Sequence, residues 1–473
     1  MKSYNQFYID GEWVDAVQSR RSFKLVNPAT EEVFAEIALG DEHDVDRAVK
    51  AARRAFASFS QTTPAERAAL LRRIAETMGR READLMAAAT QEMGTPLSSV
   101  SHARLSVEQF KQGAAVLDHY AFERMLGTNI IRREAIGVCG LVSPWNWPIQ
   151  TICTKLASAL AAGCTVVLKP SEYTPICALL IAEILHEAGV PPGVFNLVNG
   201  DGPTVGRAMS THPDIDMLSF TGSTRAGIQV ALDAAPTVKR VCQELGGKSA
   251  HIILPDADLA AAARFEIARG CGNSGQSCHA PTRVLVHRDQ LEQVLALLAE
   301  EANKLVVGDP TKPETNLGPV VNRSQYERIQ GYIRKGIEEG ARLVCGGPER
   351  PAGLERGFYI RPTVFADVTP QMTIARDEIF GPVLSVISYR DVDEAVAIAN
   401  DSPYGLGGYV FASTPARARD VGVRLRAGRI ICNGAPGNQV APMGGYKQSG
   451  NGREMGVFGL EEFLEVKAMI GFA

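Results

Sequence analysis

The feature that most constrains the fold is a change of pattern at Gly137, after which short apolar runs alternate with helical stretches. The runs are rich in β-branched residues and have the length of buried strands. We expect strands at Val138–Val142, Thr165–Leu168, Val194–Val198 and Met217–Phe220, with helices at about 149–162, 175–188 and 204–210. Strands alternating with helices predict a doubly wound parallel sheet, which binds its ligand beyond the carboxyl ends of the strands.

The sequence on either side of this region has a different character. From Asp41 to about Ala121 the pattern is helical, and Thr63-Pro64-Ala65-Glu66 has the residues of a helix start. Residues 128–137 are β-branched and predict an extended hairpin. After Gly246 a second α/β region is expected, with strands near 251–254 and 282–286 and helices near 291–304 and 324–339. The apolar tail Phe463–Phe472 predicts an edge strand that needs a partner.

Composition excludes several classes of protein. A chain of 473 residues, 45% of them hydrophobic, can bury a large core and indicates two or three domains. The net charge of −4 gives no reason to expect nucleic acid or an anionic membrane as a partner. Nine scattered cysteines without a C-x-x-C pair argue against disulfides and a metal site. With no signal peptide and no apolar run of about 18 residues, a cytoplasmic protein is expected.

Cys278 is the candidate nucleophile. Most free cysteines act as small buried hydrophobes, and the other cysteines, in apolar surroundings, fit that description. Cys278 instead follows the polar, flexible sequence Gly275-Gln276-Ser277, where a thiol could meet a ligand. Because neighbouring side chains in extended chain point apart, we expect His279 to border a substrate entrance and not to serve as the base. Cys271 is expected to pack beneath the nucleophile.

Glu244 and Asn146 are candidates for the remaining acid–base and hydrogen-bonding roles. Glu244 ends an apolar stretch and precedes Gly246-Gly247, so a partly buried, movable carboxylate could take a proton from water. The alternative is a structural ion pair with Lys248 or Lys239. Asn146 lies between two tryptophans and two prolines, which would hold its amide rigidly, as an oxyanion hole requires. The alternative is a turn asparagine that bonds its own backbone.

Two segments are candidates for binding a dinucleotide. Lys169-Pro170-Ser171-Glu172 follows a predicted strand, where Lys and Glu could bind ribose hydroxyls; a glutamate there would repel a 2′-phosphate and so favours NAD over NADP, which remains possible. A solvated ion pair is the alternative. From Phe220, a predicted strand runs through Gly222 and Ser223 into a helix bearing Gly227, a suitable seat for a pyrophosphate.

These segments together resemble the NAD(P)-dependent aldehyde dehydrogenase superfamily over essentially the whole chain. The resemblance is carried, in the family's order, by FYIDGEWV from Phe7, PWNWP from Pro144, KPSE from Lys169, FTGST from Phe220, ELGGK from Glu244, NSGQSC ending at Cys278, EIFGPV from Glu378 and PMGGYKQSGNGRE from Pro442. Each segment is modest evidence alone, but the ordered set is specific.

The resemblance implies a role for each candidate. Cys278 would be the nucleophile, Glu244 the general base, and Asn146 with the Cys278 backbone N–H would hold the oxyanion, while Lys155 matches a lysine linked to proton relay. The implied NAD contacts are Trp145, Lys169, Ser171, Glu172, Phe220, Gly222, Ser223, Gly227, Leu245, Glu378 and Phe380. The implied reaction is oxidation of an aldehyde to the acid through a thiohemiacetal and a thioester, with water as acyl acceptor.

The resemblance also implies a domain organisation. It predicts an α/β fold with a Rossmann-like NAD-binding domain (1–117 and 137–246), a second α/β catalytic domain (247–442) and a small β bridging arm (118–136 and 443–473). The C-terminal strand would find its partner on another subunit, giving a homodimer or homotetramer. Cys271 and Met443 stand where the family often has phenylalanine. Thr154 and the small residues at 434–440 lead us to expect a roomy, largely apolar entrance for medium aliphatic or aromatic aldehydes.

Three other functions remain open at this level. A CoA-acylating semialdehyde dehydrogenase would pass the acyl group to CoA, but such relatives typically lack the base at Glu244. A non-catalytic binding protein on the same fold would have no need of Cys278, Glu244 and Asn146 together. A cysteine hydrolase without a cofactor would leave Lys169–Glu172 and Gly222–Gly227 unexplained.

Overall fold

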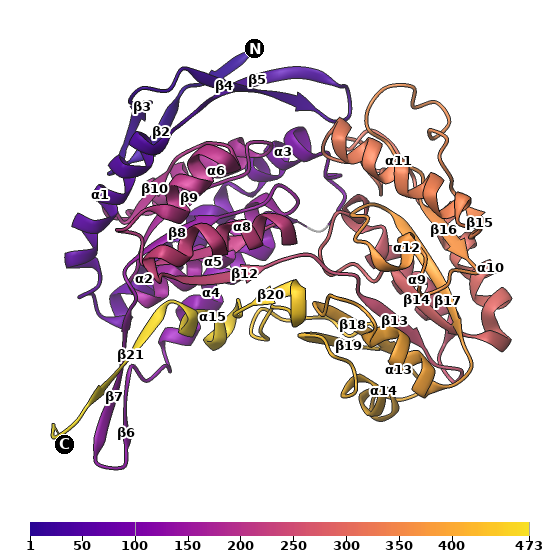
Figure 1. Cartoon of the computed structure of the whole chain (residues 1–473). Helices are drawn as coiled ribbons and strands as arrows, with labels where there is room; N and C mark the ends of the chain where they lie inside the picture. Colours follow the sequence, from indigo (N-terminus) through magenta and orange to yellow (C-terminus); the bar gives the residue numbers. More distant parts are fainter. Residues whose placement is uncertain (100, 473) are drawn as a thin grey trace.

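The computed structural model describes residues 1–99 and 101–472 and contains two large sheets side by side, with a smaller sheet at each end of the first (Figure 1). The first large sheet has the order β20-β12-β11-β8-β9-β10-β2-β3. Its strands are β2 (Gln6–Ile9), β3 (Glu12–Asp15), β8 (Val138–Val142), β9 (Thr165–Lys169), β10 (Phe195–Leu197), β11 (Met217–Thr221), β12 (Arg240–Glu244) and β20 (Gly450–Asn451). The five from β12 to β10 pair in parallel, which confirms the predicted α/β fold.

Helices cover both faces of this sheet because its strands are apolar on both sides. Val138 and Val142 pack with Val45 and Ala48 of α1, whereas Leu141, pointing the other way, packs against the opposite helical layer. The helices of this half are α1 (Glu42–Phe59), α2 (Pro64–Arg80), α3 (Glu82–Met93), α4 (His102–Leu117), α5 (Pro148–Ala162), α6 (Pro175–Glu187), α7 (Arg207–Thr211) and α8 (Thr224–Ala234). The predicted capping box at Thr63 and Glu66 begins α2.

Sequence prediction placed several boundaries slightly wrongly. The helix expected at about 204–210 is a π-helical turn at Gly202–Gly206 followed by α7. Strand β10 covers only the centre of the run 194–198. The hairpin expected at 128–137 turns earlier, at Gly127 and Thr128, so that residues 128–137 supply mainly its second strand.

The second large sheet has the order β15-β16-β17-β14-β13-β18-β19 and is parallel except at β15. Its strands are β13 (Ala250–Ile253), β14 (Arg283–His287), β15 (Arg342–Cys345), β16 (Thr363–Ala366), β17 (Val383–Tyr389), β18 (Gly407–Phe411) and β19 (Arg429–Cys432). Its helices are α9 (Leu259–Gly270), α10 (Leu291–Asn303), α11 (Arg323–Glu338), α12 (Thr373–Arg376), α13 (Val392–Asn400) and α14 (Pro415–Gly422). The second α/β region expected after Gly246 is therefore present.

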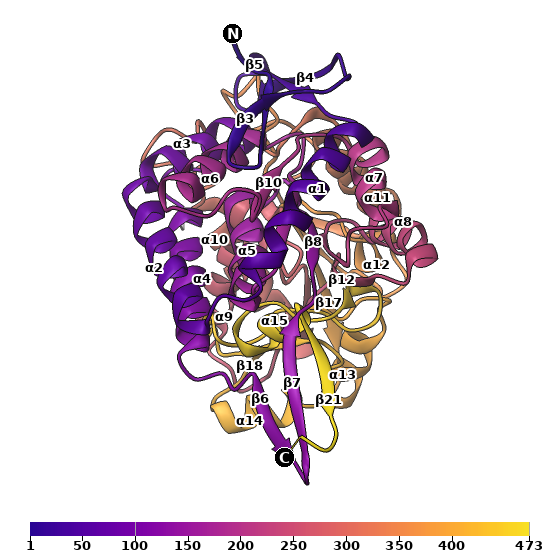
Figure 2. The same ribbon diagram turned by 90° about the vertical axis from the view of Figure 1, so that its left-hand side faces the viewer.

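Two small sheets lie at the ends of the first half. One contains β1 (Lys2–Tyr4), β5 (Glu32–Leu39) and β4 (Arg21–Asn27). The other is an arm of β6 (Glu123–Leu126), β7 (Asn129–Ala135) and β21 (Leu464–Met469), which extends away from the body beyond α15 (Gly456–Glu462) (Figure 2). β21 pairs with β7 of the same chain, which joins the hairpin and the C-terminal strand in one arm as expected, while a partner on another subunit stays a prediction. Antiparallel pairing within the chain satisfies the backbone of the β21 edge that faces β7.

Candidate active site

The order of the first sheet predicts a ligand crevice at the edge where the predicted site residues lie. Successive strands proceed from β8 to β9 and β10 on one side and to β11 and β12 on the other, so the direction of winding reverses between β8 and β11. Loops at the carboxyl ends of strands flanking such a reversal diverge and leave room for a ligand. The loop after β8 carries Asn146, and the loop after β11 carries Gly222 and Ser223.

The segment that presents Cys278 has an unusual backbone. Asn273, Ser274 and Gly275 have φ of 55°, 56° and 70° in succession. A Cβ at position 275 would collide with the backbone of Gly381, so glycine is required there. Side chains hold this turn: Ser274 Oγ donates to Gly318 O at 2.8 Å, and Gln276 Oε1 accepts from the Val321 N–H at 2.9 Å. A strained backbone held so firmly indicates a functional position.

Hydrogen bonds join the PWNWP loop to the cysteine segment. Asn146 Nδ2 donates to Gln276 O at 2.9 Å, and Asn273 Nδ2 donates to Asn146 O at 2.8 Å. Trp147 Nε1 donates to Ser277 Oγ at 3.1 Å. One N–H of the Asn146 amide is thus anchored and the other remains for a ligand, because an amide nitrogen carries two donors. The structure therefore brings together the predicted nucleophile and the predicted amide donor.

Cys278 is half-buried and lies near two carboxylates. Burial, and then the carboxylates of Glu378 and Glu244, raise the pKa of its thiol above the usual range. Its Sγ lies 4.0 Å from Nδ1 of His279, and burial followed by the charges of Arg269 and Arg429 lowers the imidazole pKa to about 3. A neutral imidazole at that distance does not stabilise a thiolate. Cys271 is buried nearby and lines the same cavity as His279.

Glu244 ends β12 and is 7% exposed, with no hydrogen-bond partner for either carboxylate oxygen among the described residues. Neither expected lysine pairs with it: Lys239 donates to the carbonyls of Ser210 and His212, and Lys248 Nζ is itself buried without a partner in the same part of the chain. Burial, and then the charge of Glu454, raise the pKa of Glu244, which favours a group that can accept a proton.

Lys155 lies 2.5 Å from Glu454 Oε1 and 2.9 Å from Ser219 Oγ, and it is 1% exposed. No chemical role was assigned to Glu454 from the sequence, although Glu454 ends the family segment PMGGYKQSGNGRE that begins at Pro442. The only sequence signal is a carboxylate after a glycine-rich stretch, which is common on surfaces. The structure adds it to the site because its charge acts on Glu244.

The predicted cofactor residues lie along the same crevice. Lys169, at the end of β9, donates to Pro170 O and Gly200 O at 2.8 Å each and lies 3.8 Å from Glu172. Ser223 caps α8, where its Oγ accepts from the Ala226 N–H at 3.3 Å, and the N–H groups of that first turn suit a phosphate.

The other end of the crevice is formed by Glu378 and Phe380. Glu378 Oε1 accepts from the Gly247 N–H at 3.0 Å, and Phe380 has a φ of 61°. The ring of Trp145 meets that of Phe380 edge-on at 5.4 Å, so Trp145 lies beside Phe380. Ser171, Phe220 and Leu245 are nearly buried, and Gly227 packs against Leu245.

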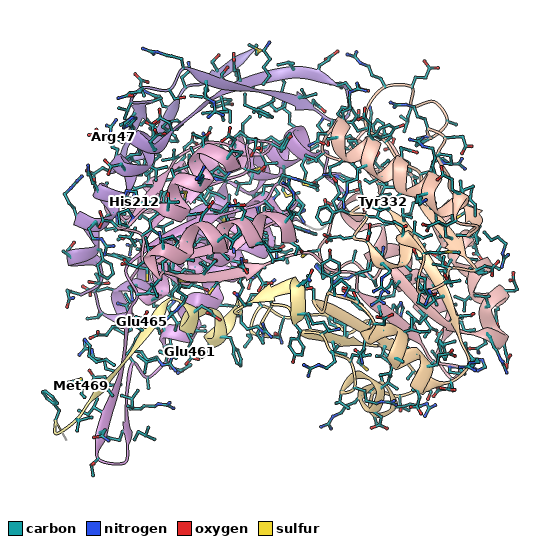
Figure 3. All side chains as sticks on the ribbon, in the orientation of Figure 1. Arg47, His212, Tyr332, Glu461, Glu465 and Met469 are labelled. Atoms are coloured by element: carbon teal, nitrogen blue, oxygen red, sulfur yellow. The ribbon has the colours of Figure 1, made fainter. Side chains whose placement is uncertain are left out.

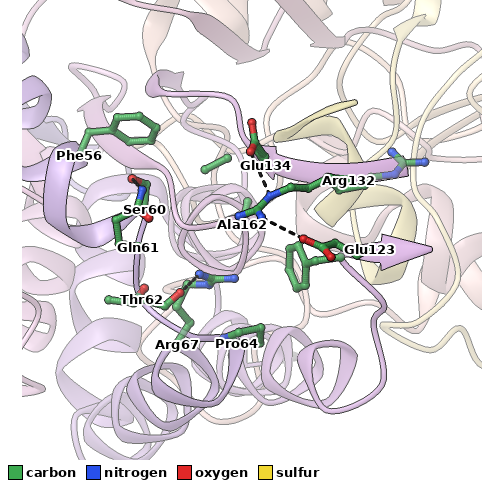
Figure 4. A pocket seen from close by; sticks show the side chains of 13 residues that line it. Phe56, Ser60, Gln61, Thr62, Pro64, Arg67, Glu123, Arg132, Glu134 and Ala162 are labelled. Carbon is green, nitrogen blue, oxygen red and sulfur yellow. Dashed lines mark hydrogen bonds and ion pairs between the residues drawn. The ribbon is translucent and has the colours of Figure 1, made fainter. Parts of the chain in front are cut away.

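Other features of the molecule are remote from this chemistry. A cavity of about 350 Å³ lies between α2 and the base of the arm (Figure 4). Its Arg132 is paired with Glu123 and Glu134 at 2.9 and 3.0 Å, so its charge is compensated within the chain. In residues 1–99 and 101–472 no group of three or more metal-binding side chains is assembled. No helix in the described part of the chain has the length and apolarity needed to cross a bilayer.

A doubly wound α/β sheet that brings a cysteine, an amide and a carboxylate together beside residues suited to a dinucleotide defines a class, the cysteine-dependent oxidoreductases. Residues 13–469 match the aldehyde dehydrogenase family, and the chain belongs to that family. It is an aldehyde dehydrogenase, an oxidoreductase.

Similar proteins agree over the full length. The chain is 51% identical to 3-succinoylsemialdehyde-pyridine dehydrogenase of a Pseudomonas species, covering 100% of this chain and 99% of that one. A crystal structure of an aldehyde dehydrogenase C mutant from Pseudomonas syringae, in complex with NAD+ and octanal, is 55% identical with a TM-score of 0.98 and covers 99% of this chain and 97% of that one. The Mycobacterium tuberculosis aldehyde dehydrogenase complexed with NAD+ is 39% identical with a TM-score of 0.96, covering 100% and 99%.

Proposed function

We propose that this enzyme oxidises an aldehyde to the carboxylic acid with NAD, using Cys278 as nucleophile and water as acyl acceptor. The observation that carries the proposal is the 2.9 Å bond that ties the Asn146 amide to the Cys278 segment, close to a carboxylate, Glu244, whose oxygens have no partner among the described residues. A nucleophile, a fixed donor and a free base are the groups that acyl chemistry at a thiol needs.

Each residue has a distinct task in this mechanism. Glu244 takes the thiol proton of Cys278 and passes it to solvent, the Cys278 thiolate adds to the aldehyde carbon, and the free N–H of Asn146 with the Cys278 backbone N–H stabilises the oxyanion. NAD, when bound, supplies the hydride acceptor. Glu244 then takes a proton from water, which attacks the resulting thioester, releases the acid and frees the thiol. Lys155, held by Glu454, sets the charge around Glu244.

We propose that Lys169, Ser171 and Glu172 contact the adenosine ribose, that Phe220, Gly222, Ser223, Gly227 and Leu245 form the pyrophosphate site, and that Glu378, Phe380 and Trp145 bind the nicotinamide end. The capping position of Ser223 and the position of the partly exposed Glu172 carboxylate, 3.8 Å from Lys169, support this arrangement. Because a second anion beside Glu172 is unfavourable, NAD should bind better than NADP.

The proposal includes three structural parts, namely an NAD-binding domain (1–117 and 137–246), a catalytic domain (247–442) and a bridging arm (118–136 and 443–473). It also includes assembly into a homodimer or homotetramer in the cytoplasm. The arm supports assembly: Val466, Ile470 and Phe472 are 58%, 75% and 70% exposed, and Figure 3 shows Glu465 and Met469 along this extended segment. Apolar side chains on an exposed sheet edge favour contact with a second copy.

The direct test is NADH formation with purified protein, NAD and a panel of aldehydes in the absence of CoA. We expect turnover by the natural enzyme and none by Cys278→Ala, with Cys432→Ala as a matched control for loss of a thiol. Turnover only after CoA is added would overturn water as the acceptor. A flat response to the whole panel, with and without CoA, would contradict the proposed reaction.

A further inference from the structure

A cavity of about 370 Å³ opens beside the proposed nucleophile. Ser277 and His279, the two neighbours of Cys278, both line it, as do Trp147 and Cys271. This size lies within the range of cavities that hold small organic ligands. Thr154 and the loop at 434–440, which were expected to shape the entrance, are absent from its wall. The cavity is therefore where the chain of an aldehyde held at Cys278 would extend.

The wall of this cavity is largely apolar, as expected, but it includes buried polar atoms. His102 is 1% exposed, stacks on Trp147 with ring centroids 4.2 Å apart, and its Nδ1 has no partner among the described residues. Asn273 Oδ1 is likewise buried and unpartnered in that part of the chain. Buried polar atoms without partners are costly, so these two positions favour a ligand or solvent with polar groups.

The outer part of the cavity carries uncompensated positive charge. Arg269, in the last turn of α9, lines it, and no carboxylate in residues 1–99 and 101–472 lies within 4.0 Å of its guanidinium. The nearest acidic residue along the helix, Glu266, is fully buried and bonded to His251 at 2.6 Å. It therefore cannot serve as an ion-pair partner at the surface.

A second arginine lies on the same side of the site. Arg429 begins β19 and pairs in register with Gly407, and a Cβ on Gly407 would lie 3.7 Å from Cβ of His279. Arg429 is half-buried and, in the described chain, forms no ion pair with a carboxylate. The charges of Arg269 and Arg429 both act on His279, and of the two Arg269 lines the cavity.

We propose that Arg269, with Arg429 behind it, binds a carboxylate at the far end of the substrate, so that the preferred substrates are ω-oxo acids, aldehydes whose chain ends in a carboxylate. The inference rests on the proposed function, because it requires the aldehyde group to sit at Cys278. The guanidinium fork matches a carboxylate in two hydrogen bonds. The product would be a dicarboxylate.

The test compares ω-oxo acids of about five to ten carbons with their methyl esters, which have the same chain without the charge. We expect the acid to exceed its ester by about tenfold in kcat/KM, chiefly through KM, for at least one chain length. In Arg269→Gln this ratio should fall to about one, and Arg269→Gln with Arg429→Gln should favour the ester.

Arg264→Gln provides a matched control. Arg264 is on the same helix, is exposed and also lacks a carboxylate partner in the described chain, but it does not line the cavity. Its acid-to-ester ratio should stay at the natural value. The ratio should also shrink at high ionic strength in the natural enzyme, since partly exposed charges are screened.

Acid-to-ester ratios near one at every chain length in the natural enzyme would overturn the inference while leaving the proposed function intact, because the esters would still be oxidised. An equal loss of the ratio in Arg264→Gln would also overturn it, since net charge alone would then explain the preference. Absence of turnover with both acids and esters would instead contradict the proposed function.

Discussion

At the residue scale, the site depends on how a few buried charges are placed. Glu244 has a raised pKa because it is buried and faces Glu454, whereas Lys155 acts in the opposite direction. A general base works when it is deprotonated, so its pKa sets the acidic limb of the pH–rate profile. If Glu244 is the base, as we propose, the ion pair between Lys155 and Glu454 adjusts its pKa.

Substitutions of Glu454 and of Lys155 should shift the pH–rate profile in opposite directions. Glu454→Gln removes a negative charge and should shift the acidic limb of kcat to lower pH, whereas Lys155→Met removes a positive charge and should shift it to higher pH. The measurement is kcat against pH for each variant, with thermal unfolding to check folding. Limbs that coincide with the natural one would mean that Glu244 does not limit turnover.

The amide of Asn146 should contribute through the transition state. Asn146→Ala is expected to lower kcat by about a hundredfold, because one oxyanion donor is lost. Asn303→Ala, an exposed amide on α10, is the control. The rate of Cys278 alkylation by iodoacetamide reports whether the cysteine segment stays in place. A kcat within a factor of about three of the natural value, with alkylation unchanged, would assign Asn146 a purely structural role.

At the element scale, helices and loops hold one another through single side chains. Glu92, near the end of α3, is buried and accepts hydrogen bonds from the N–H groups of Ile176 and Cys177 at 2.5 and 3.1 Å. These are donors of the first turn of α6, which lacks a side-chain cap of its own. One carboxylate thus satisfies a helix terminus and links two helices.

This link predicts a pH-dependent stability. Burial raises the Glu92 pKa from 4.5 to about 8, so the folded state holds a proton that the unfolded state releases between these values. The contribution of protonated Glu92 to the free energy of unfolding is complete below pH 4.5 and is lost as the pH rises towards 8. The Tm of Glu92→Gln relative to the natural protein should therefore increase from pH of about 5 to about 8.

Thermal unfolding across that pH range is the measurement, with Glu76→Gln as the exposed control on α2, where no such trend is expected. A Tm difference for Glu92→Gln that does not vary with pH would show that Glu92 has the same charge in the folded and unfolded states.

At the scale of the whole molecule, the arm leaves two sheet edges available. β7 is the central strand, and β6 and β21 each have one edge unpaired within residues 1–99 and 101–472. Met125 and Leu126 on β6 and Val466 on β21 are 55%, 63% and 58% exposed. An exposed edge with apolar side chains is a site of association with another chain.

A charge on this edge should weaken assembly. Val466→Lys is expected to shift the protein towards monomer in analytical ultracentrifugation while Tm changes little at a concentration where both are monomeric, because the side chain is exposed in the single chain. Val17→Lys, at another exposed valine that is 47% exposed, is the control. Identical oligomer distributions for both variants would exclude the arm from the interface.

The sequence by itself determined the α/β class and most strands of the first sheet, and it singled out Cys278, Glu244 and Asn146 as the proposed catalytic groups, because these depend on local periodicity and on motifs short in sequence. Val138–Val142 was predicted to the residue since both its faces are apolar. Boundaries at 202–211 and at the hairpin were missed because a π-helical turn and a turn at Gly127 have little local signature.

Only the tertiary structure decided which charges meet. Lys155 and Glu454 are 299 residues apart in the chain yet 2.5 Å apart in space. Long-range packing also determines three other features. These are the pairing of β21 with β7, the absence of a bond from Glu244 to Lys239 or Lys248, and the position of the unpaired Arg269 at a cavity beside Cys278. Periodicity records which face of an element is buried, but it does not record what lies opposite that face.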